Sequence, residues 1–322
     1  MVTESSKKRL FDTIKLLFFL LSILFFYYLL RHIGFDKIGQ TFRHIGIYGA
    51  SILLIAGLFE NVFDAASLQY ATPQRTVLWK ILSINSVGGL MNTLLPWDMG
   101  EVIKGALIKK HASLKDSVTG VVLYNLIFKL SKPLVIFGAI LVVFLFPSEH
   151  DWTLLLLLLG ASFLSFIPFF FISLMLKFSL TTHLFSLLSR FSKRDYRAFL
   201  AKTRSFEIGL EQFRRERSGD YYRVLLLQIF ARVVSLITFL IVARLLESEY
   251  SFEILLIANA YINLANYIAM LIPAKLGVTE GTSYLVFSML GLDGGIGVMI
   301  ALVLRIKALF TMTLSSILLL FI

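Results

Sequence analysis

The sequence predicts an all-α polytopic membrane protein, built as an inverted repeat of three transmembrane helices plus one re-entrant hairpin in each half. Three observations predict it: an apolar composition, two apolar stretches broken by polar residues, and a residue spacing that occurs twice. Of the 322 residues, 57% are hydrophobic and 16% are charged, whereas a soluble domain has about 45–50% and about 25%. With a mean hydropathy of +0.82, this apolar surface indicates many bilayer-spanning segments rather than one soluble core.

The formal net charge of +11 and the absence of cysteine narrow the function classes. Cytoplasmic loops of membrane proteins are rich in Lys and Arg, so the charge indicates membrane topology and not a nucleic-acid partner. Without cysteine there are no disulfides and no thiolate metal sites. No metal site, cofactor or catalytic motif is predicted, and the chain is expected to be no enzyme.

Six stretches reach the length of about 20 apolar residues that a helix needs to cross the bilayer. They are Phe11–Leu30, Gly46–Ala66, Ser117–Phe146, Thr153–Leu176, Arg223–Leu246 and Ile296–Ile322. The first follows Lys7, Lys8 and Arg9 without a small-residue cleavage site, so we expect a retained span and not a signal peptide. The third contains Pro133, so we expect it to tilt, to kink, or to start outside the lipid.

Two further apolar stretches are interrupted by glycine and asparagine. Ile81–Pro96 contains Asn85, Gly88, Gly89 and Asn92, and Ile254–Pro273 contains Asn259, Asn263 and Asn266. Each ends at a proline that is followed by a glycine. Irregular backbone at membrane depth needs the protection of surrounding helices, so the sequence predicts re-entrant hairpins near residues 81–104 and 254–290.

The two hairpins share one spacing of proline, glycine and aspartate. The residues are Pro96, Gly100 and Asp116, and then Pro273, Gly277 and Asp293, each 177 residues later. The same shift carries the second and third spans onto the fifth and sixth. The sequence therefore predicts a first membrane repeat over 1–150 and a second over 151–322. The alternative is convergent loop spacing in an ordinary helical bundle.

The loop charges predict the orientation. The segment 177–223 contains eleven Lys and Arg residues, which assigns it to the cytoplasm together with both termini; the loop with Arg31, Lys37 and Arg43 departs from this rule. The first hairpin then enters from the cytoplasm and the second from outside, an architecture of transporters. The insert 177–222 is expected to lie on anionic lipid at the cytoplasmic surface, and the chain in the inner or plasma membrane.

The two hairpin motifs resemble the lysylphosphatidylglycerol synthase/flippase transmembrane family. The segment from Asn92 to Lys104 is similar to that family's N-x-L-L-P-x-x-x-G-E-x-x-R/K, and Leu271–Glu280 to its L-P-x-x-x-G-x-x-E. Trp97 and Asp98 stand where the family often has a basic residue. The resemblance implies the lipid-translocating part alone, without the soluble aminoacyl-transferring domain of some members.

Charged residues at bilayer depth cost at least about 2.5–3.5 kcal/mol, so they are expected to be paired or functional. The candidate substrate-binding residues are Asn92, Asp98, Glu101, Lys104, Lys129, Lys132, Asn266, Lys275, Glu280 and Arg305. The candidate hairpin-structural residues are Pro96, Gly100, Pro273 and Gly277. A phospholipid head group carries both signs of charge, and the helices that follow Pro96 and Pro273 would direct amide dipoles at its phosphate.

Other roles remain open for several of these residues. Glu101 and Glu280 could cap their helices or pair with nearby lysines, and the lysines of the third span could snorkel to an interface. Glu60 lies one helical turn before Asp64, and a buried pair of Glu60 with Arg232 would hold the two halves together.

These features lead to a functional hypothesis of flippase-like translocation of a phospholipid or aminoacyl-phospholipid, without covalent chemistry. The alternatives are a small-solute transporter or channel, and a membrane enzyme acting on a lipid-linked substrate. The expected partners are membrane phospholipids. A separate lipid-modifying enzyme and a homo-oligomer both remain open.

Overall fold

Eight helices make up the part of the chain that the structure, a computed structural model, describes. The described residues are 31, 35–72, 76–94, 99–109, 114–145, 156, 159–160, 163–164, 166, 170, 213, 215–246, 249–268 and 277–317. In chain order the helices are α2 (Phe35–Ala71), α3 (Leu78–Leu94), α4 (Met99–Ile108), α5 (Leu114–Leu145), α9 (Ser218–Leu246), α10 (Phe252–Ile268), α11 (Val278–Met289) and α12 (Gly294–Ile317). The predicted span Phe11–Leu30, most of Thr153–Leu176 and most of the insert 177–222 lie outside these residues.

Four of the helices are long and apolar enough to cross a membrane. They are α2 over Arg43–Ala71, α5 over Asp116–Val142, α9 over its whole length and α12 over its whole length. They coincide with the predicted spans that start at Gly46, Ser117, Arg223 and Ile296. The chain is therefore an all-α, multi-pass membrane protein.

Helix α2 changes direction at Gly46, where the backbone has φ 60° and ψ −175°. Only glycine adopts this positive φ without strain, so the predicted start of the span is also a structural break. Beyond it, exposed Ile52, Ile55 and Phe59 recur at helical spacing on one face of α2. Such large apolar side chains suit contact with lipid and leave the opposite face for packing.

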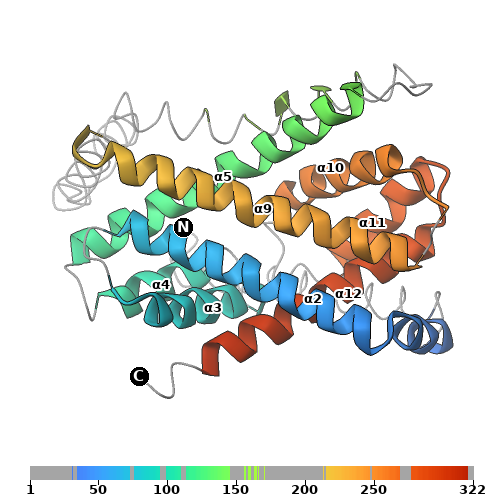
Figure 1. The fold of residues 1–322 in the computed structure, drawn as a ribbon, viewed down its shortest axis with the longest axis horizontal. Helices are drawn as coiled ribbons and strands as arrows, with labels where there is room; N and C mark the ends of the chain where they lie inside the picture. The colour runs from blue at the N-terminus through green and yellow to red at the C-terminus, as the bar shows by residue number, and fades with distance from the viewer. Residues whose placement is uncertain are drawn as a thin grey trace, which may run out of the picture.

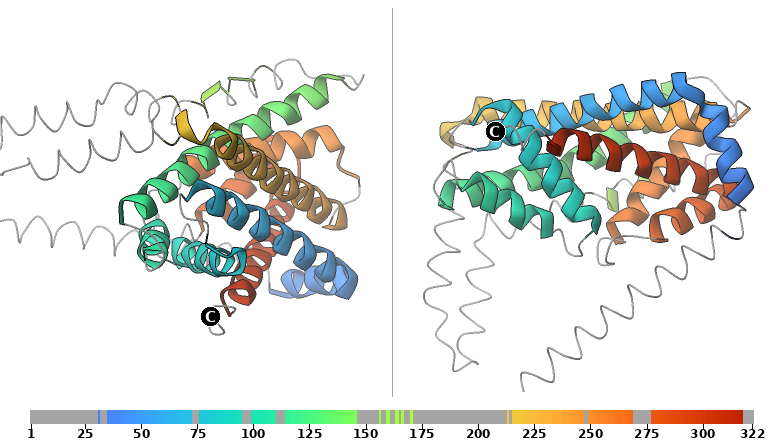
Figure 2. Two further views of the ribbon diagram at one scale, coloured as in Figure 1. Left: turned by 60° about the vertical axis from the view of Figure 1, so that its left-hand side comes forward. Right: turned by 90° about the horizontal axis from the view of Figure 1, so that it is seen from below.

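The long helices α2 and α9 pack against each other in antiparallel directions (Figure 1). The end of α2 and the beginning of α9 meet at one end of the bundle, where Arg217 Nη1 donates to the Thr72 carbonyl oxygen at 3.2 Å. The short helices α3 and α4 lie toward this end of the bundle, and α10 and α11 lie toward the opposite end (Figure 1). Helix α12 packs against α2, α3, α9 and α11, so it connects the two ends (Figure 2).

Two separate apolar clusters stabilise the two ends of this bundle. One joins α2, α3, α4, α5 and the start of α9, and the other joins α2, α10, α11, α12 and the end of α9. On α9, Val224 belongs to the first cluster and Phe239 to the second. Arg232 lies between them, midway between Ser218 and Leu246. Polar residues therefore concentrate at the middle of the bundle, the depth at which burial in lipid is most costly.

Candidate functional site

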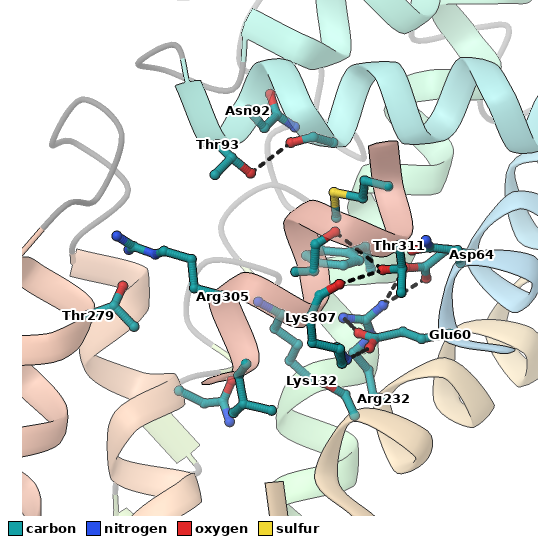
Figure 3. Close-up of a pocket in the computed structure, with 18 of the residues that line it drawn as sticks. Glu60, Asp64, Asn92, Thr93, Lys132, Arg232, Thr279, Arg305, Lys307 and Thr311 are labelled. Atoms are coloured by element: carbon teal, nitrogen blue, oxygen red, sulfur yellow. Dashed lines mark hydrogen bonds and ion pairs between the residues drawn. The ribbon is translucent and has the colours of Figure 1, made fainter. Parts of the chain in front are cut away.

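A cavity of about 490 Å³ opens between the helices at this depth, with lining residues on all eight described helices. Its charged lining residues are the cations Lys104, Lys129, Lys132, Arg232, Arg305 and Lys307 and the carboxylates Glu60, Asp64 and Glu101. Figure 3 shows Lys132 reaching into the cavity from α5 and Arg305 directed away from the ion pairs around Glu60. The volume lies in the range of about 300–1,000 Å³ that small-molecule sites occupy.

A network of ion pairs joins α2 to α9 and α12 at the cavity wall (Figure 3). Arg232 Nη2 lies 2.6 Å from Asp64 Oδ2, and Arg232 Nη1 lies 3.6 Å from Glu60 Oε1. Lys307 Nζ contacts Glu60 Oε2 at 2.8 Å. The predicted contact between Glu60 and Arg232 is confirmed, but Asp64 is the closer partner of this arginine.

Glu101 organises the contact between α3 and α4. Its Oε1 accepts hydrogen bonds from Asn92 Nδ2 at 2.8 Å and from Lys104 Nζ at 2.9 Å. Its Oε2 accepts one from Asn125 Nδ2 of α5 at 2.8 Å. Asn92 Oδ1 accepts the N–H of Gly100 at 2.6 Å. The predicted site residues Asn92, Glu101 and Lys104 therefore form one network at the cavity wall. The carboxylate of Glu101 connects α3 and α4 to α5.

Two glycines allow the close approach of α4 to α3. A Cβ on Gly100 would lie 1.9 Å from the carbonyl oxygen of Gly88, and a Cβ on Gly88 would lie 2.4 Å from Cγ of Lys104. The stem of Lys104 therefore occupies the space that Gly88 leaves. Its ammonium group lies 4.8 Å from the centre of the Tyr124 ring, and the residue is only 4% exposed. Both glycines thus lie where α3 and α4 approach most closely, and any larger side chain there would collide with the neighbouring helix.

The start of α11 has a different arrangement, centred on Glu280. Gly277 begins α11 with φ 75°, a conformation that favours glycine. Glu280 Oε2 accepts the N–H of Gly277 at 3.0 Å, and its Oε1 lies 2.9 Å from Arg305 Nη1. Glu280 is fully buried and lies behind the cavity wall, whereas Arg305 is on it. The glutamate therefore caps a helix and holds Arg305 in position.

The two lysines of α5 line the cavity, which favours the lining role over snorkelling to an interface. Lys132 Nζ lies 4.7 Å from the centre of the Phe128 ring, and the guanidinium carbon of Arg232 also lies 4.7 Å from that centre. The aromatic ring faces both cations, an arrangement that partly compensates for their removal from water.

Several predicted residues cannot be placed at the site. Pro96, Asp98, Pro273 and Lys275 lie outside the described residues, and Asn266 belongs to α10 without a described side chain. The cavity is also lined by polar residues that the sequence did not predict, among them Asn61, Asn85, Ser86, Asn125, Thr279 and Thr311. A signal existed for Asn125, which lies one helical turn before Lys129. The described residues include no group of three His, Asp or Glu side chains arranged to hold a metal ion.

A family model described as the lysylphosphatidylglycerol synthase TM region matches residues 14–316, nearly the whole chain. No curated protein and no solved structure matches the chain.

Proposed function

The chain belongs to the lysylphosphatidylglycerol synthase transmembrane-region family, and on that premise we propose that it translocates a phospholipid across the bilayer without covalent chemistry. The observation that carries this proposal is the charged cavity at the middle of the membrane-spanning helices. Nine charged side chains line it, and each would be costly at that depth unless paired or used. A fold that needed only stability would be served as well by apolar residues, since buried ion pairs add little to it.

The size of the cavity supports a head-group path and not a site for a whole lipid. About 490 Å³ corresponds to roughly sixteen water molecules at about 30 Å³ each. This is room for a phosphate and a small substituent, while the acyl chains stay in the surrounding lipid. Lining residues of both signs replace the water that the head group loses on entry.

The inverted repeat belongs to this proposal, with 1–150 and 151–322 as its two halves. It is supported by the order of long, short, short and long helices, which occurs in α2 to α5 and again in α9 to α12. It is also supported by the position of the two short pairs at opposite ends of the bundle (Figure 1). In this architecture substrate sites lie near the midplane, and the halves rock against each other for alternating access.

The ion pairs of the cavity would guide such a motion. Arg232 and Lys307 belong to the second half, and their partners Asp64 and Glu60 belong to the first. If the two halves rocked against each other, Arg232 and Lys307 could exchange the carboxylates that they contact. No charged side chain would then be left unpaired in the membrane. The chain would lie in the inner or plasma membrane with both termini in the cytoplasm, and the insert 177–222 on its anionic surface.

Reconstitution tests the proposal directly. Purified full-length protein in phosphatidylcholine vesicles is expected to expose acyl-labelled fluorescent phospholipid to external dithionite faster than empty vesicles do. An Arg232→Met variant should be slow, and Lys109→Gln, at an exposed lysine outside the cavity, should match the wild type. Lipid exposure at the empty-vesicle rate for every phospholipid tried would contradict the proposal. Flux of small solutes, or a new lipid product in mass spectra, would favour the transporter or enzyme alternatives.

A further inference from the structure

Polar side chains continue from the cavity along the contact between α2 and α9. On α9, Gln228 lies one helical turn before Arg232, and Asp220 lies two turns before Gln228. On α2, Ser67 follows Asp64 by three residues and lies on the same side of the helix. Gln228 Nε2 donates to Ser67 Oγ at 2.9 Å, and Arg232 pairs with Asp64. We call these five residues the α2–α9 polar stripe.

The stripe runs from the cavity to the end of the bundle that holds Arg217. Gln228 and Ser67 are fully buried, whereas the side chain of Arg217 is 24% exposed. Arg217 contacts Asp220 through Nε at 2.9 Å and the Thr72 carbonyl oxygen through Nη1 at 3.2 Å. Interhelical hydrogen bonds add little, on average, to the stability of membrane bundles. A path between the cavity and this end of the bundle is therefore a better reason for the stripe than stability.

One buried oxygen in the middle of the stripe lacks a hydrogen-bond partner among the described residues. It is Oε1 of Gln228, a residue with 0% exposure. Buried amide oxygens normally accept a hydrogen bond from protein or from ordered water, and polar surroundings favour a bridging water. One helical turn advances about 5.4 Å, a gap that one water spans with two hydrogen bonds of about 2.7–2.8 Å each. Water at Gln228 would therefore connect successive side chains of the stripe into one hydrogen-bonded chain.

Asp64 is the acidic group at the cavity end of the stripe. Its closest charged contact among the described residues is Arg232, at 2.6 Å. Neighbouring helices add further charged or titratable groups around it, except α3, whose cavity residues are uncharged. These groups are Glu60 of α2 itself, Lys104 of α4, Tyr124 of α5 and, through Glu60, Lys307 of α12. A proton on Asp64 would therefore change the charge balance of a cluster that joins several helices.

A neutral Asp64 leaves no charge in the ion-pair network of α2, α9 and α12 without a partner. Arg232 keeps Glu60 at 3.6 Å, and Glu60 keeps Lys307 at 2.8 Å. The contact that weakens is the one between Asp64 and Arg232, which joins α2 to α9. A proton at this position would therefore loosen the two proposed halves without the cost of an isolated charge in the membrane.

Building on the proposed translocation, we infer that lipid movement is coupled to proton movement, with Asp64 as the proton carrier and the α2–α9 polar stripe as its path to the end that holds Arg217. A hydronium ion in this path gives its proton to a carboxylate oxygen of Asp64 and becomes water. One O–H bond breaks in the hydronium ion and one forms on Asp64. After the halves have moved, the carboxyl group returns the proton to water on the opposite side of the membrane. The cycle therefore needs no other reactant and moves one proton for each lipid.

The distribution of lipid at steady state tests this coupling. Full-length protein is reconstituted in phosphatidylcholine vesicles with traces of acyl-labelled phosphatidylcholine, phosphatidylethanolamine or phosphatidylglycerol, and valinomycin with equal potassium on both sides holds the membrane potential at zero. A pH difference of one unit is then imposed. With one proton per lipid, the ratio of labelled lipid in the outer to the inner leaflet should change about tenfold, the equivalent of about 1.4 kcal/mol. A ratio that ignores the gradient while lipid still crosses would overturn the inference and retain translocation.

Substitution of Asp64 tests the carrier. Asp64→Asn keeps an oxygen that faces Arg232 but has no carboxyl group to protonate, so the change in the lipid ratio should be lost. Asp293→Asn is the control, at an exposed aspartate outside the cavity, and should keep the full change. A full change in Asp64→Asn would reject Asp64 as the proton carrier.

Substitution of Gln228 tests the path. Gln228→Leu should slow proton entry and leave the steady-state lipid ratio as in the wild type, because a path sets a rate and not an equilibrium. Thr238→Val is the control, at a buried polar residue of α9 whose hydroxyl donates within its own helix. Proton entry at the wild-type rate in Gln228→Leu would reject the stripe as the path.

Proton entry is measured separately in the same vesicles, with the pH-sensitive dye pyranine inside. After the outside is acidified, the internal pH should fall faster with the wild-type protein than with Asp64→Asn or in empty vesicles. Proton entry that depends on Asp64 while no labelled lipid moves would retain the proton carrier and reject the flippase. Proton entry at the empty-vesicle rate with the wild-type protein would reject the coupling.

Discussion

Arg232 Nη2 lies 2.6 Å from Asp64 Oδ2 and thereby joins the middle of α9 to α2 across 168 residues of sequence. The same arginine reaches Glu60 at 3.6 Å, and Glu60 is also held by Lys307. The contact links the two proposed halves at the depth where an unpaired charge would be most costly. The stability of the fold and the proposed transport therefore involve the same small group of residues, and variants can separate the two.

Arg232→Met is expected to destabilise the protein by about 3–5 kcal/mol, because it removes the cation that two buried carboxylates contact. Unfolding of the purified protein by denaturant in micelles measures this change. Arg223→Met on the same helix is the control, since the side chain of Arg223 is 58% exposed in its pair with Asp220 and such pairs contribute under about 1 kcal/mol.

The double variant Arg232→Met with Asp64→Leu should recover part of the lost stability, because it removes the carboxylate together with its cation. Two results would show that the pair contributes nothing to the fold. The double variant could lose more stability than the two single substitutions predict together, or Arg232→Met could be no less stable than Arg223→Met.

Gly100→Ala is expected to lower the unfolding temperature, because its Cβ would lie 1.9 Å from the backbone oxygen of Gly88. Forcing apart two packed helices costs typically about 1–3 kcal/mol. Gly105→Ala is the matched control on α4, since no heavy atom lies within 4 Å of its added Cβ. It should leave stability unchanged or raise it by about 0.5–1 kcal/mol. Equal effects of the two substitutions would argue against close packing of α3 and α4.

Glu101→Gln is expected to slow lipid exposure about tenfold while the yield of folded protein stays near that of the wild type. The amide still accepts a hydrogen bond from Asn92 or Asn125, but it no longer neutralises buried Lys104. Adding Lys104→Met should restore thermal stability without restoring transport. Recovery of transport in this double variant would show that the pair only supports the hairpin.

Replacement of Glu280 should separate helix capping from charge pairing. Glu280→Gln keeps an oxygen that can accept the N–H of Gly277 but loses the charge that faces Arg305, whereas Glu280→Ala loses both. We expect thermal stability to fall from wild type to Gln and further to Ala, with about 1–3 kcal/mol for the unsatisfied buried N–H. Glu249→Ala, at an exposed site, should change nothing. Equal stabilities of the Gln and Ala variants would assign no stabilising effect to the cap.

The spans could be predicted because their signal is local. About 20 apolar residues identify a span without any knowledge of its neighbours, and α2, α5, α9 and α12 agree with the predicted spans. The repeat spacing selected Gly100 and Gly277 before their geometry was known. The structure gives the physical reason for each glycine: Gly100 allows α4 to approach Gly88 of α3, and Gly277 adopts a left-handed backbone conformation. Neither reason can be derived from a residue spacing, because one depends on a neighbouring helix and the other on a local turn.

The ion-pair partners could not be predicted in full, because they depend on how the helices cross. On α2, Glu60 and Asp64 lie one turn apart and offer similar carboxylates to a facing arginine. The sequence favoured Glu60, and the geometry gives Arg232 mainly to Asp64 and leaves Glu60 for Lys307. Glu280 looked equivalent to Glu101 in the repeat, yet only Glu101 lines the cavity. Helix rotation decides such differences, and it is set by packing over the whole bundle.

Labelling of single introduced cysteines tests the orientation of the two proposed hairpins, because the chain contains no cysteine of its own. Lys109 follows α4 and Glu249 lies between α9 and α10, and both are exposed. The arginines near the start of α9 predict, by the positive-inside rule, that this end of the bundle faces the cytoplasm. We therefore expect a membrane-impermeant maleimide to label Glu249→Cys in intact cells and Lys109→Cys only after permeabilisation. The cysteine-free parent is the control for background labelling. If both positions react from the same side, the halves are not inverted copies, and alternating access between them loses its structural basis.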